Sequence, residues 1–295
     1  MNKADGTFLI VTADDFGSSL EVNRAVEKTA REGILTCASL TVSGPAVDDA
    51  VRIARSIPTL EIALHITLTD GRPVSPTQSV PSLVARDGRF KDSPTQLGLA
   101  LQFSKEVQRQ VEMEVAAQFK AFEDTRLGFS HVDCHHHLHV HPKLFDIILE
   151  NALRHGLRTI RIPYEPWEIS GAICKGNTLR NRFYRTVFTR LSARCKDKIH
   201  PHGMISSDGV FGLYQTGELT EEWILMLLDR LRHWPGSFEL YAHPSTKTGS
   251  PGHLELKALL NPRIRERMEE NGIRLIRHMD MARLRVHVQP PAHRA

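Results

Sequence analysis

The chain has 295 residues, of which 41% are hydrophobic and 24% charged, and its formal net charge is +4. This composition is that of an ordinary globular protein and excludes a disordered, collagen-like or coiled-coil chain. No apolar run approaches the roughly 18 residues of a membrane-spanning helix. The four cysteines are widely spaced, which argues against a disulfide scaffold and a zinc ribbon. The apolar run at residues 8–13 is too short for a signal peptide, so we expect a cytoplasmic protein.

Short apolar runs alternate with amphipathic helical patterns along the chain. Residues 8–11 predict a buried strand, and Ser18 with Glu21 predicts a capping box that begins a helix ended by Gly33. Further strands are expected over residues 34–42, 60–68, 129–134, 159–162, 238–242 and 273–276. Further helices are expected over residues 46–56, 106–122, 142–155, 218–233 and 262–270. The alternation predicts an α/β fold with mostly parallel strands, in the form of an irregular (β/α) barrel.

The chain shows no internal repeat and no domain boundary. We therefore expect a single domain over residues 1–285, with long loops at 69–94 and 163–179 and a frayed tail at 286–295. Residues 175–198 carry eight Lys or Arg against one Asp. Apolar residues at helical spacing within about 178–197 predict a basic amphipathic helix, with either a solvated face or a peripheral contact to anionic lipid. No nucleic-acid motif accompanies it, so we expect no nucleic-acid partner.

Polar residues end four of the predicted strands, and one of the four is followed by a histidine-rich window. Asp14 and Asp15 follow the first strand, His65 lies near the end of the third, and His243 follows the late strand. The carboxyl ends of parallel strands meet at one edge of a sheet, so we expect these side chains to lie close together. Adjacent carboxylates repel each other, and a bound cation would relieve that repulsion. One carboxylate could then bind the ion while its neighbour acts as a base.

A histidine-rich window follows the predicted strand at residues 129–134. Six of the 16 histidines fall within residues 131–141. Imidazole sites use two to four protein ligands, and neighbours in an extended strand point to opposite faces, so one ion cannot use all six. The window lies between an apolar strand and an amphipathic helix, which favours a rigid site over a flexible chelating tract. Two histidines and one carboxylate would leave positions open for water and substrate.

Three function classes are compatible with these residues. The first is a metal-dependent hydrolase with an acid and a base beside the ion. The second is a metal-dependent phosphoesterase or amidohydrolase that uses the same ligands on another small substrate. The third is a non-enzymatic, histidine-rich metal-binding protein, which predicts several ions per chain and tolerance of Asp14→Asn.

Four segments, in order, resemble the YdjC/ChbG-type carbohydrate deacetylases. They are residues 12–17 (TADDFG), 33–40 (GILTCASL), 64–73 (LHITLTDGRP) and 131–139 (HVDCHHHLH). Within that family, residues 161–166 (RIPYEP) and 255–263 (ELKALLNPR) are most similar to the hopanoid-biosynthesis-associated deacetylases. The resemblance implies a distorted (β/α) barrel that removes the N-acetyl group from an N-acetylglucosamine-type sugar. It also implies a divalent metal, usually magnesium.

The resemblance also implies roles for individual residues. The metal would be bound by Asp15, His65 and His135, the first histidine of the triple. Asp14 would be the general base that activates water, and His243 the general acid that protonates the leaving nitrogen.

Three further residues carry expectations. Cys134, where relatives often have Ser or Gly, places a thiol beside a ligand and favours a softer ion such as zinc. Arg161 and His137 are expected to contact substrate. The likeness to hopanoid enzymes implies a lipid-linked sugar, and the basic helix would then hold the protein at the inner membrane surface. The sequence leaves the oligomeric state open, a homodimer included.

Overall fold

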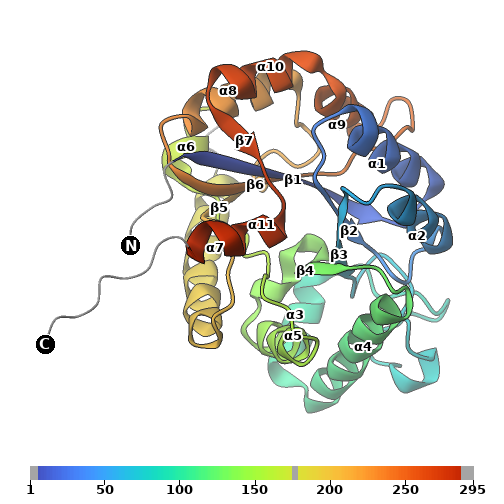
Figure 1. Ribbon diagram of the computed structural model, residues 1–295. Helices are drawn as coiled ribbons and strands as arrows, with labels where there is room; N and C mark the ends of the chain where they lie inside the picture. The colour runs from blue at the N-terminus through green and yellow to red at the C-terminus, as the bar shows by residue number, and fades with distance from the viewer. Residues whose placement is uncertain (1–5, 175–178, 287–295) are drawn as a thin grey trace, which may run out of the picture.

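A computed structural model describes the backbone of residues 6–174 and 179–286 (Figure 1). Its strands are β1 Thr7–Phe16, β2 Cys37–Leu40, β3 Glu61–Ile66, β4 Phe129–Cys134, β5 Gly209–Phe211, β6 Gly236–Ala242 and β7 Ile273–Leu275. They form one sheet in the order β4-β3-β2-β1-β6-β5, and β7 pairs with β1 beside this path. Each of these pairings is parallel. The described chain is therefore a single α/β domain with the predicted parallel, barrel-like arrangement.

The helices surround the strands. They are α1 Leu20–Glu32, α2 Val47–Ser56, α3 Pro94–Phe103, α4 Lys105–Asp124, α5 Pro142–Arg154, α6 Trp167–Ser170, α7 Leu179–Ile199, α8 Glu221–Leu231, α9 Pro251–Leu260, α10 Pro262–Glu270 and α11 His278–Val286. Short 3₁₀ segments cover Thr77–Ser79, His135–Val140 and His200–His202. In Figure 1 most helices lie on the outside of the strands, whereas α11 lies near the middle of the view.

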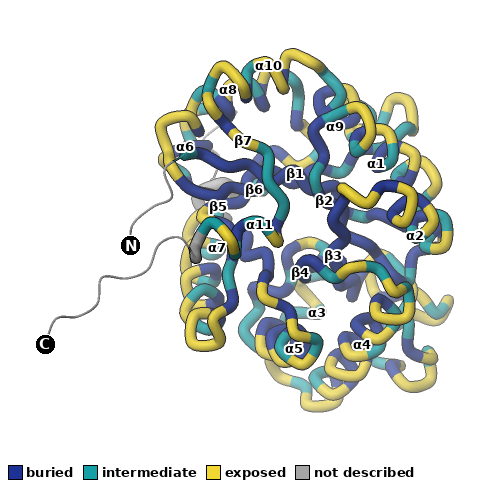
Figure 2. The backbone as a smooth tube through the Cα atoms, in the orientation of Figure 1, coloured by how far each residue is buried: buried dark blue, intermediate teal, exposed yellow. Residues whose placement is uncertain are grey.

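The burial pattern follows from this arrangement. The strands are dark blue in Figure 2, and the outward faces of the surrounding helices are yellow. β3 is buried along its whole length, as expected for a parallel strand covered on both faces. Helix α5 buries one stripe that includes Leu144, Phe145 and Ile148, which matches its sequence pattern. The apolar core therefore lies between the strands and the outer helices, and the barrel interior is left for polar groups.

Some element boundaries agree with the sequence patterns and others do not. The predictions for residues 129–134 and 262–270 match β4 and α10. The predicted capping box is wrong, because the side chain of Ser19, not Ser18, accepts the Val22 N–H at the start of α1. The backbone N–H of Ser18 instead closes a turn onto the Asp15 carbonyl. Gly33 does end α1, as predicted.

Other differences concern weak local signals. The predicted strand at residues 159–162 forms only isolated bridges, from Thr159 to Ile205 and from Ile160 to Val132. Pro163 follows and has no N–H with which to extend the pairing. Helices α3, α9 and α11 and strand β5 were not expected. Helix α11 lacks a continuous apolar stripe because it buries only His278 and Met281 among its described side chains.

The predicted basic helix exists as α7, and part of it packs on the domain. Ser192, Cys195 and Ile199 are buried, and the Arg185 guanidinium lies 5.4 Å from the centre of the Trp167 ring. The start of the basic segment, at residues 175–178, lies outside the described residues, as does most of the predicted frayed tail, at 287–295. Among the helices that the structure describes, none is long and apolar enough to cross a membrane.

Candidate active site and metal centre

The two adjacent carboxylates lie within β1, not after it. The register of β1 against β2 shifts beyond Ala13, and Asp15 has φ 62°. A non-glycine residue seldom adopts this left-handed conformation, and such strain is concentrated at functional sites. The irregularity interrupts the strict alternation of side chains along the strand. Asp14 consequently contacts Arg161, while Asp15 contacts His65 in the same part of the barrel.

Three possible metal-ligand atoms lie close together, one each from Asp15, His65 and His135. Asp15 Oδ1 lies 3.3 Å from His65 Nε2 and 3.1 Å from His135 Nδ1. The two nitrogens are 3.4 Å apart. Ligands about 2.1 Å from an ion in a tetrahedral arrangement are about 3.4 Å apart, so these residues fit a divalent ion. The structure thus brings together the three residues that were predicted as ligands.

Asp133 orients His65 and was not anticipated from the sequence. The two residues are paired across β3 and β4, and His65 Nδ1 donates to Asp133 Oδ1 at 2.7 Å. His65 Nε2 is therefore the nitrogen that faces the other two donors. A carboxylate behind a histidine ligand fixes the ring and strengthens metal binding. One sequence feature could have indicated Asp133: it lies two residues after His131, a spacing that places both side chains on the same face of β4.

Charge around Asp133 shifts the pKa values of the buried groups. Burial alone would lower the pKa of His65, but the carboxylates of Asp133 and Asp15 raise it well above its usual value. Burial alone would raise the pKa of Asp133, but the Arg161 guanidinium and His65 hold it well below its usual range. Ser39 Oγ donates a further hydrogen bond to Asp133 at 2.6 Å. Asp133 is therefore an ionised carboxylate held by several donors.

Arg161 lies inside the barrel, fully buried. It makes a bidentate pair with Asp14, at 2.7 and 2.9 Å, and also contacts Asp133 at 2.7 Å and Glu239 at 2.8 Å. Burial raises the pKa of Asp14, and the Arg161 charge opposes that shift. A guanidinium enclosed by three carboxylates has no exposed surface for a ligand. The geometry thus places Arg161 against Asp14, and its predicted substrate contact stays a prediction.

The histidine window is not an extended strand beyond Cys134. It turns into the 3₁₀ segment His135–Val140, in which His136 and His137 have φ 54° and 53°. The expectation that neighbouring side chains alternate between two faces is therefore wrong there. The conclusion that one ion cannot use every histidine still holds, because only His135 joins the donor group with Asp15 and His65.

The other histidines of the window lie outside that donor group, and His136 shares Asp70 with His135. His136 is exposed and its Nε2 donates to Asp70 Oδ2 at 2.8 Å. His137 is buried, with its ring centre 4.8 Å from that of Tyr241. His139 is buried and bonded through Nε2 to the Arg161 carbonyl at 2.8 Å. Burial of two of these rings is not what a flexible chelating tract would show.

His243 follows β6 beside Asp14. Ala13 in β1 pairs with Ala242 in β6, so Asp14 and His243 are the next residues on neighbouring strands. The His243 backbone N–H donates to Glu255 Oε2 at 2.5 Å, and Glu255 is fully buried in α9. A side chain on Gly252 would meet the His243 carbonyl at 2.4 Å, so only glycine lets α9 begin this close. Glu255 anchors the segment that carries His243.

Cys134 does not belong to the donor group. Its side chain lies in the apolar core, and burial raises the pKa of its thiol. A protonated, buried thiol is not a metal ligand. Cys134 therefore gives no reason to expect zinc at this site. The donor atoms that are present, two imidazole nitrogens and a carboxylate oxygen, suit divalent transition metals by themselves.

Comparison with known proteins extends these observations. The chain is 29% identical over 286 residues to a carbohydrate deacetylase of Geobacillus stearothermophilus, covering 94% of this chain and 99% of that protein. It is 39% identical over 160 residues to a carbohydrate deacetylase of Brevibacillus brevis, a match that covers 54% of this chain and 59% of that relative.

A solved structure from Enterococcus faecalis, of a protein assigned to cellobiose-phosphate cleavage, is similar with a TM-score of 0.69 and 24% identity. The match covers 94% of this chain and 99% of that one, and at this identity it supports the fold alone. The model of the YdjC-like protein family matches residues 8–270. Since that match spans most of the sequence, the chain belongs to the YdjC-like family.

Proposed function

We propose that this protein is a metal-dependent hydrolase that removes the N-acetyl group from an N-acetylglucosamine-type sugar. The carrying observation is the group of facing donor atoms on Asp15, His65 and His135, with Asp14 adjacent in the chain. The two relatives named carbohydrate deacetylases supply the amide bond and the sugar, because the donor group alone would also suit other hydrolases.

The metal would be held by one carboxylate oxygen and two imidazole nitrogens. Magnesium, which the family resemblance implies, prefers oxygen ligands, whereas zinc and its neighbours bind imidazole well. We therefore include zinc beside magnesium as the resident ion. When bound, the ion would lower the pKa of a bound water and polarise the acetyl oxygen.

The protein's own groups supply the proton transfers. Asp14, held at both carboxylate oxygens by Arg161, is oriented to accept the proton of the attacking water. His243, the next residue on the neighbouring strand, would donate a proton to the departing nitrogen. Such general acid–base steps contribute about a hundred- to ten-thousand-fold each. The Arg161 pairing keeps the base in place between turnovers.

His137 is the residue we propose for substrate contact. Its side chain is buried beside Tyr241, and its Nδ1 has no hydrogen-bond partner among the described residues. Burial lowers the pKa of His137 well below its usual value, with the nearby Arg161 charge acting in the same direction. A neutral imidazole with one unpaired nitrogen can bond a sugar hydroxyl.

The finer assignment is a hopanoid-linked sugar. It is based on the likeness of residues 161–166 and 255–263 to hopanoid-associated deacetylases, and on the basic helix α7, which would contact anionic lipid. Co-sedimentation with vesicles that contain anionic lipid at low salt tests the membrane contact. Protein that stays in the supernatant with both anionic and neutral vesicles would contradict it.

The decisive measurement is acetate release from chitobiose and from N-acetylglucosaminyl hopanoid, with and without chelator. We expect release from at least one substrate, its loss with chelator and its recovery on adding Mg²⁺ or Zn²⁺. Asp48→Asn, at an exposed position, is a matched control that should retain activity. No acetate from either substrate at any metal loading would overturn the proposal. Hydrolysis of p-nitrophenyl phosphate, measured in parallel, tests the alternative that the protein is a phosphoesterase.

A further inference from the structure

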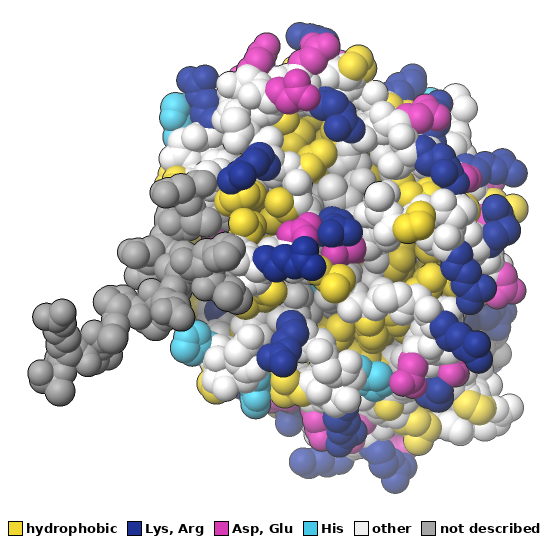
Figure 3. Space-filling view, viewed as in Figure 1, with side chains coloured by type: hydrophobic (Ala, Val, Ile, Leu, Met, Phe, Trp, Pro, Cys, Tyr) yellow, Lys and Arg dark blue, Asp and Glu magenta, His cyan; other side chains and the backbone are white. Residues whose placement is uncertain are grey.

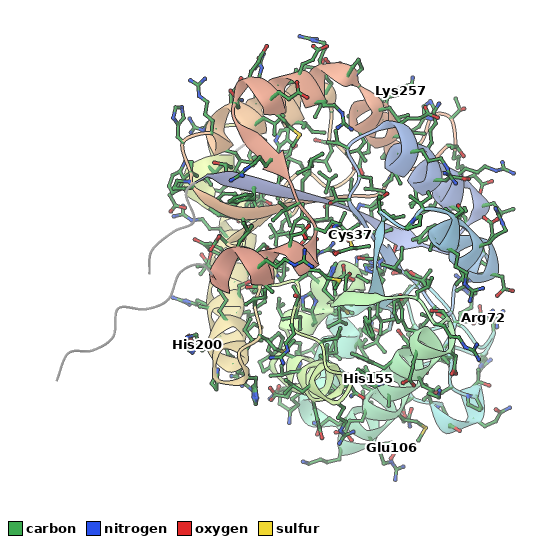
Figure 4. All side chains as sticks on the ribbon, viewed as in Figure 1. Cys37, Arg72, Glu106, His155, His200 and Lys257 are labelled. Atoms are coloured by element: carbon green, nitrogen blue, oxygen red, sulfur yellow. The ribbon has the colours of Figure 1, made fainter. Side chains whose placement is uncertain are left out.

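A second group of two histidines and one carboxylate lies within the barrel. His131 belongs to β4, Glu239 to β6, and His278 is the first residue of α11. All three are fully buried, and one donor atom from each lies within 4.8 Å of the others. In Figure 4 the labelled Cys37, whose Sγ is 3.9 Å from His131 Nδ1, marks this interior region.

His131 has the hydrogen bonding of a metal ligand. Its Nδ1 lies 3.1 Å from Ser130 Oγ, and that hydroxyl donates its own proton to the Ile62 carbonyl at 2.9 Å. The hydroxyl can therefore only accept from Nδ1, which leaves Nε2 as a bare lone pair. Nε2 has no hydrogen-bond partner among the described residues, and Asp133 Oδ2 is 3.7 Å away.

Glu239 contributes an ionised carboxylate with one free oxygen. Oε1 accepts from Thr12 Oγ1 at 2.7 Å and from two nitrogens of Arg161 at 2.8 and 3.0 Å. Burial would raise its pKa, but the charge of Arg161 holds it well below the usual value. Oε2 has no partner within the part of the chain that the structure describes. An unpaired buried oxygen of this kind is costly and is normally satisfied.

His278 leaves both ring nitrogens without a hydrogen bond to any described residue. Its Nε2 lies 3.3 Å from Glu239 Oε1, and its ring centre is 3.6 Å from that of His131 with the planes tilted by 31°. One donor atom from each of these side chains lies within 4.8 Å of the other two, so three residues from β4, β6 and α11 face one place. Binding through Nε2 of both rings would turn the His278 ring out of its stacked position.

Carboxylates gather in the barrel interior. Asp14, Asp133 and Glu239 are buried there around the Arg161 guanidinium, with the His65 and His278 rings beside Asp133 and Glu239. A cation at Glu239 would add to the positive charge that holds these carboxylates. Two imidazoles and one carboxylate select a divalent transition metal such as zinc over magnesium or calcium, whose ligands are oxygens.

We propose that His131, Glu239 and His278 bind a second divalent transition-metal ion, separate from the one expected at Asp15, His65 and His135. This ion is structural, because no surface of the three residues is open to a substrate. It would fasten α11 to the barrel interior, where Met281 of α11 packs on Ile10 and Cys37. Figure 3 shows this face of the molecule, with acidic and basic side chains side by side near its centre.

Measuring the metal content of the wild type and of variants distinguishes the two sites. Full-length protein is stripped with chelator, reloaded with Zn²⁺ alone or Co²⁺ alone, desalted through a weak competing chelator and analysed for metal per chain. We expect about two ions in the wild type, about one in His135→Ala, about one in His278→Leu and none in the double variant. Circular dichroism of each stripped variant checks that it folds.

Several outcomes would overturn the proposal. They are a single ion in the wild type that is lost in His135→Ala, or two ions that persist in His278→Leu. If His278→Leu does not fold, His278→Gln and the visible absorption of Co²⁺ in His135→Ala decide the matter. Absence of any Co²⁺ spectrum in folded His135→Ala then contradicts the site. Acetate release is measured separately, so failure of the interior site leaves the proposed function untouched.

Discussion

Two of the groups that could hold a metal ion, each with two histidines and one carboxylate, lie in different parts of one barrel. At the active site the side chains of Asp15 and His135 are 26% and 17% exposed, so water and substrate can reach an ion there. In the interior, His131, Glu239 and His278 are fully buried. The donor set alone therefore does not define a catalytic centre. Access to open coordination positions separates a reactive ion from a structural one.

One buried network joins the two regions. Asp133 bonds to His65 on the active-site side, and Arg161 links Asp133 to Glu239 in the interior. A change in either region therefore acts on the same guanidinium. Four predictions, in order of decreasing size, test whether the regions are separable.

The largest effect is expected at the general base. Asp14→Asn removes the proton acceptor but leaves Asp15 and the two histidine ligands intact. We expect turnover to fall by about a hundred- to ten-thousand-fold while metal content stays at the wild-type level. Steady-state acetate release and metal analysis check this. Near-normal turnover in this variant, with Asp48→Asn as the control, would remove Asp14 from the mechanism.

The second prediction contrasts the two regions by pH, in chelator-treated protein. Burial, with the nearby His278, lowers the pKa of His131 from 6.5 to about 4. Below pH about 6.5, His131 binds a proton in the unfolded chain but stays neutral in the folded protein. The free energy of unfolding therefore falls as the pH drops toward 4. The loss reaches about 3 kcal/mol at pH 4. His65 has the opposite effect because its pKa is raised in the folded protein. Its contribution to stability is present below pH about 6.5 and is lost as the pH rises through its pKa in the folded state.

Urea denaturation between pH 4.5 and 7.5 measures this dependence. His131→Gln should flatten the acid side of the profile, whereas His202→Gln, at an exposed position, should leave it unchanged. An identical acid slope in wild type and His131→Gln would show that His131 is not a buried neutral imidazole.

The third prediction concerns the carboxylate behind His65. Asp133→Asn keeps an oxygen near His65 Nδ1 but removes the charge that orients and strengthens the ligand. We expect active-site metal affinity to fall by about 10- to 100-fold. Competition titration with a chromophoric chelator, performed in the His278→Leu background, isolates this site. Unchanged affinity in a folded variant would argue that Asp133 serves only the ion pair with Arg161.

The smallest effect is expected from Ser39→Ala. This substitution removes one donor to Asp133 and leaves its contacts with His65 and Arg161 in place. We expect a loss of about 1 kcal/mol in stability, measured by urea denaturation. Ser79→Ala, at an exposed position, is the matched control. A loss as large as that from Asp133→Asn would show that the hydroxyl, not the guanidinium, dominates the support of Asp133.

The sequence alone determined the alternation of strands and helices and four strand-end positions of the site. Short apolar runs and helical periodicity are local signals, and Asp14, Asp15, His65 and His243 stand where those signals end. The family resemblance then selected His135 from the window. Membership of the YdjC-like family is confirmed by the match over residues 8–270. The hopanoid substrate and the residue roles stay predictions.

Which distant residues meet depends on the folded chain. Glu239 faces His131 because β4 and β6 curl around one interior, and His278 arrives there because α11 folds back across the barrel. The burial of Arg161 among three carboxylates has the same origin. Such contacts join residues far apart in the chain, and periodicity carries no information about them. Burial and pairing of charge depend on strand order and closure, which exist only once the whole chain is folded.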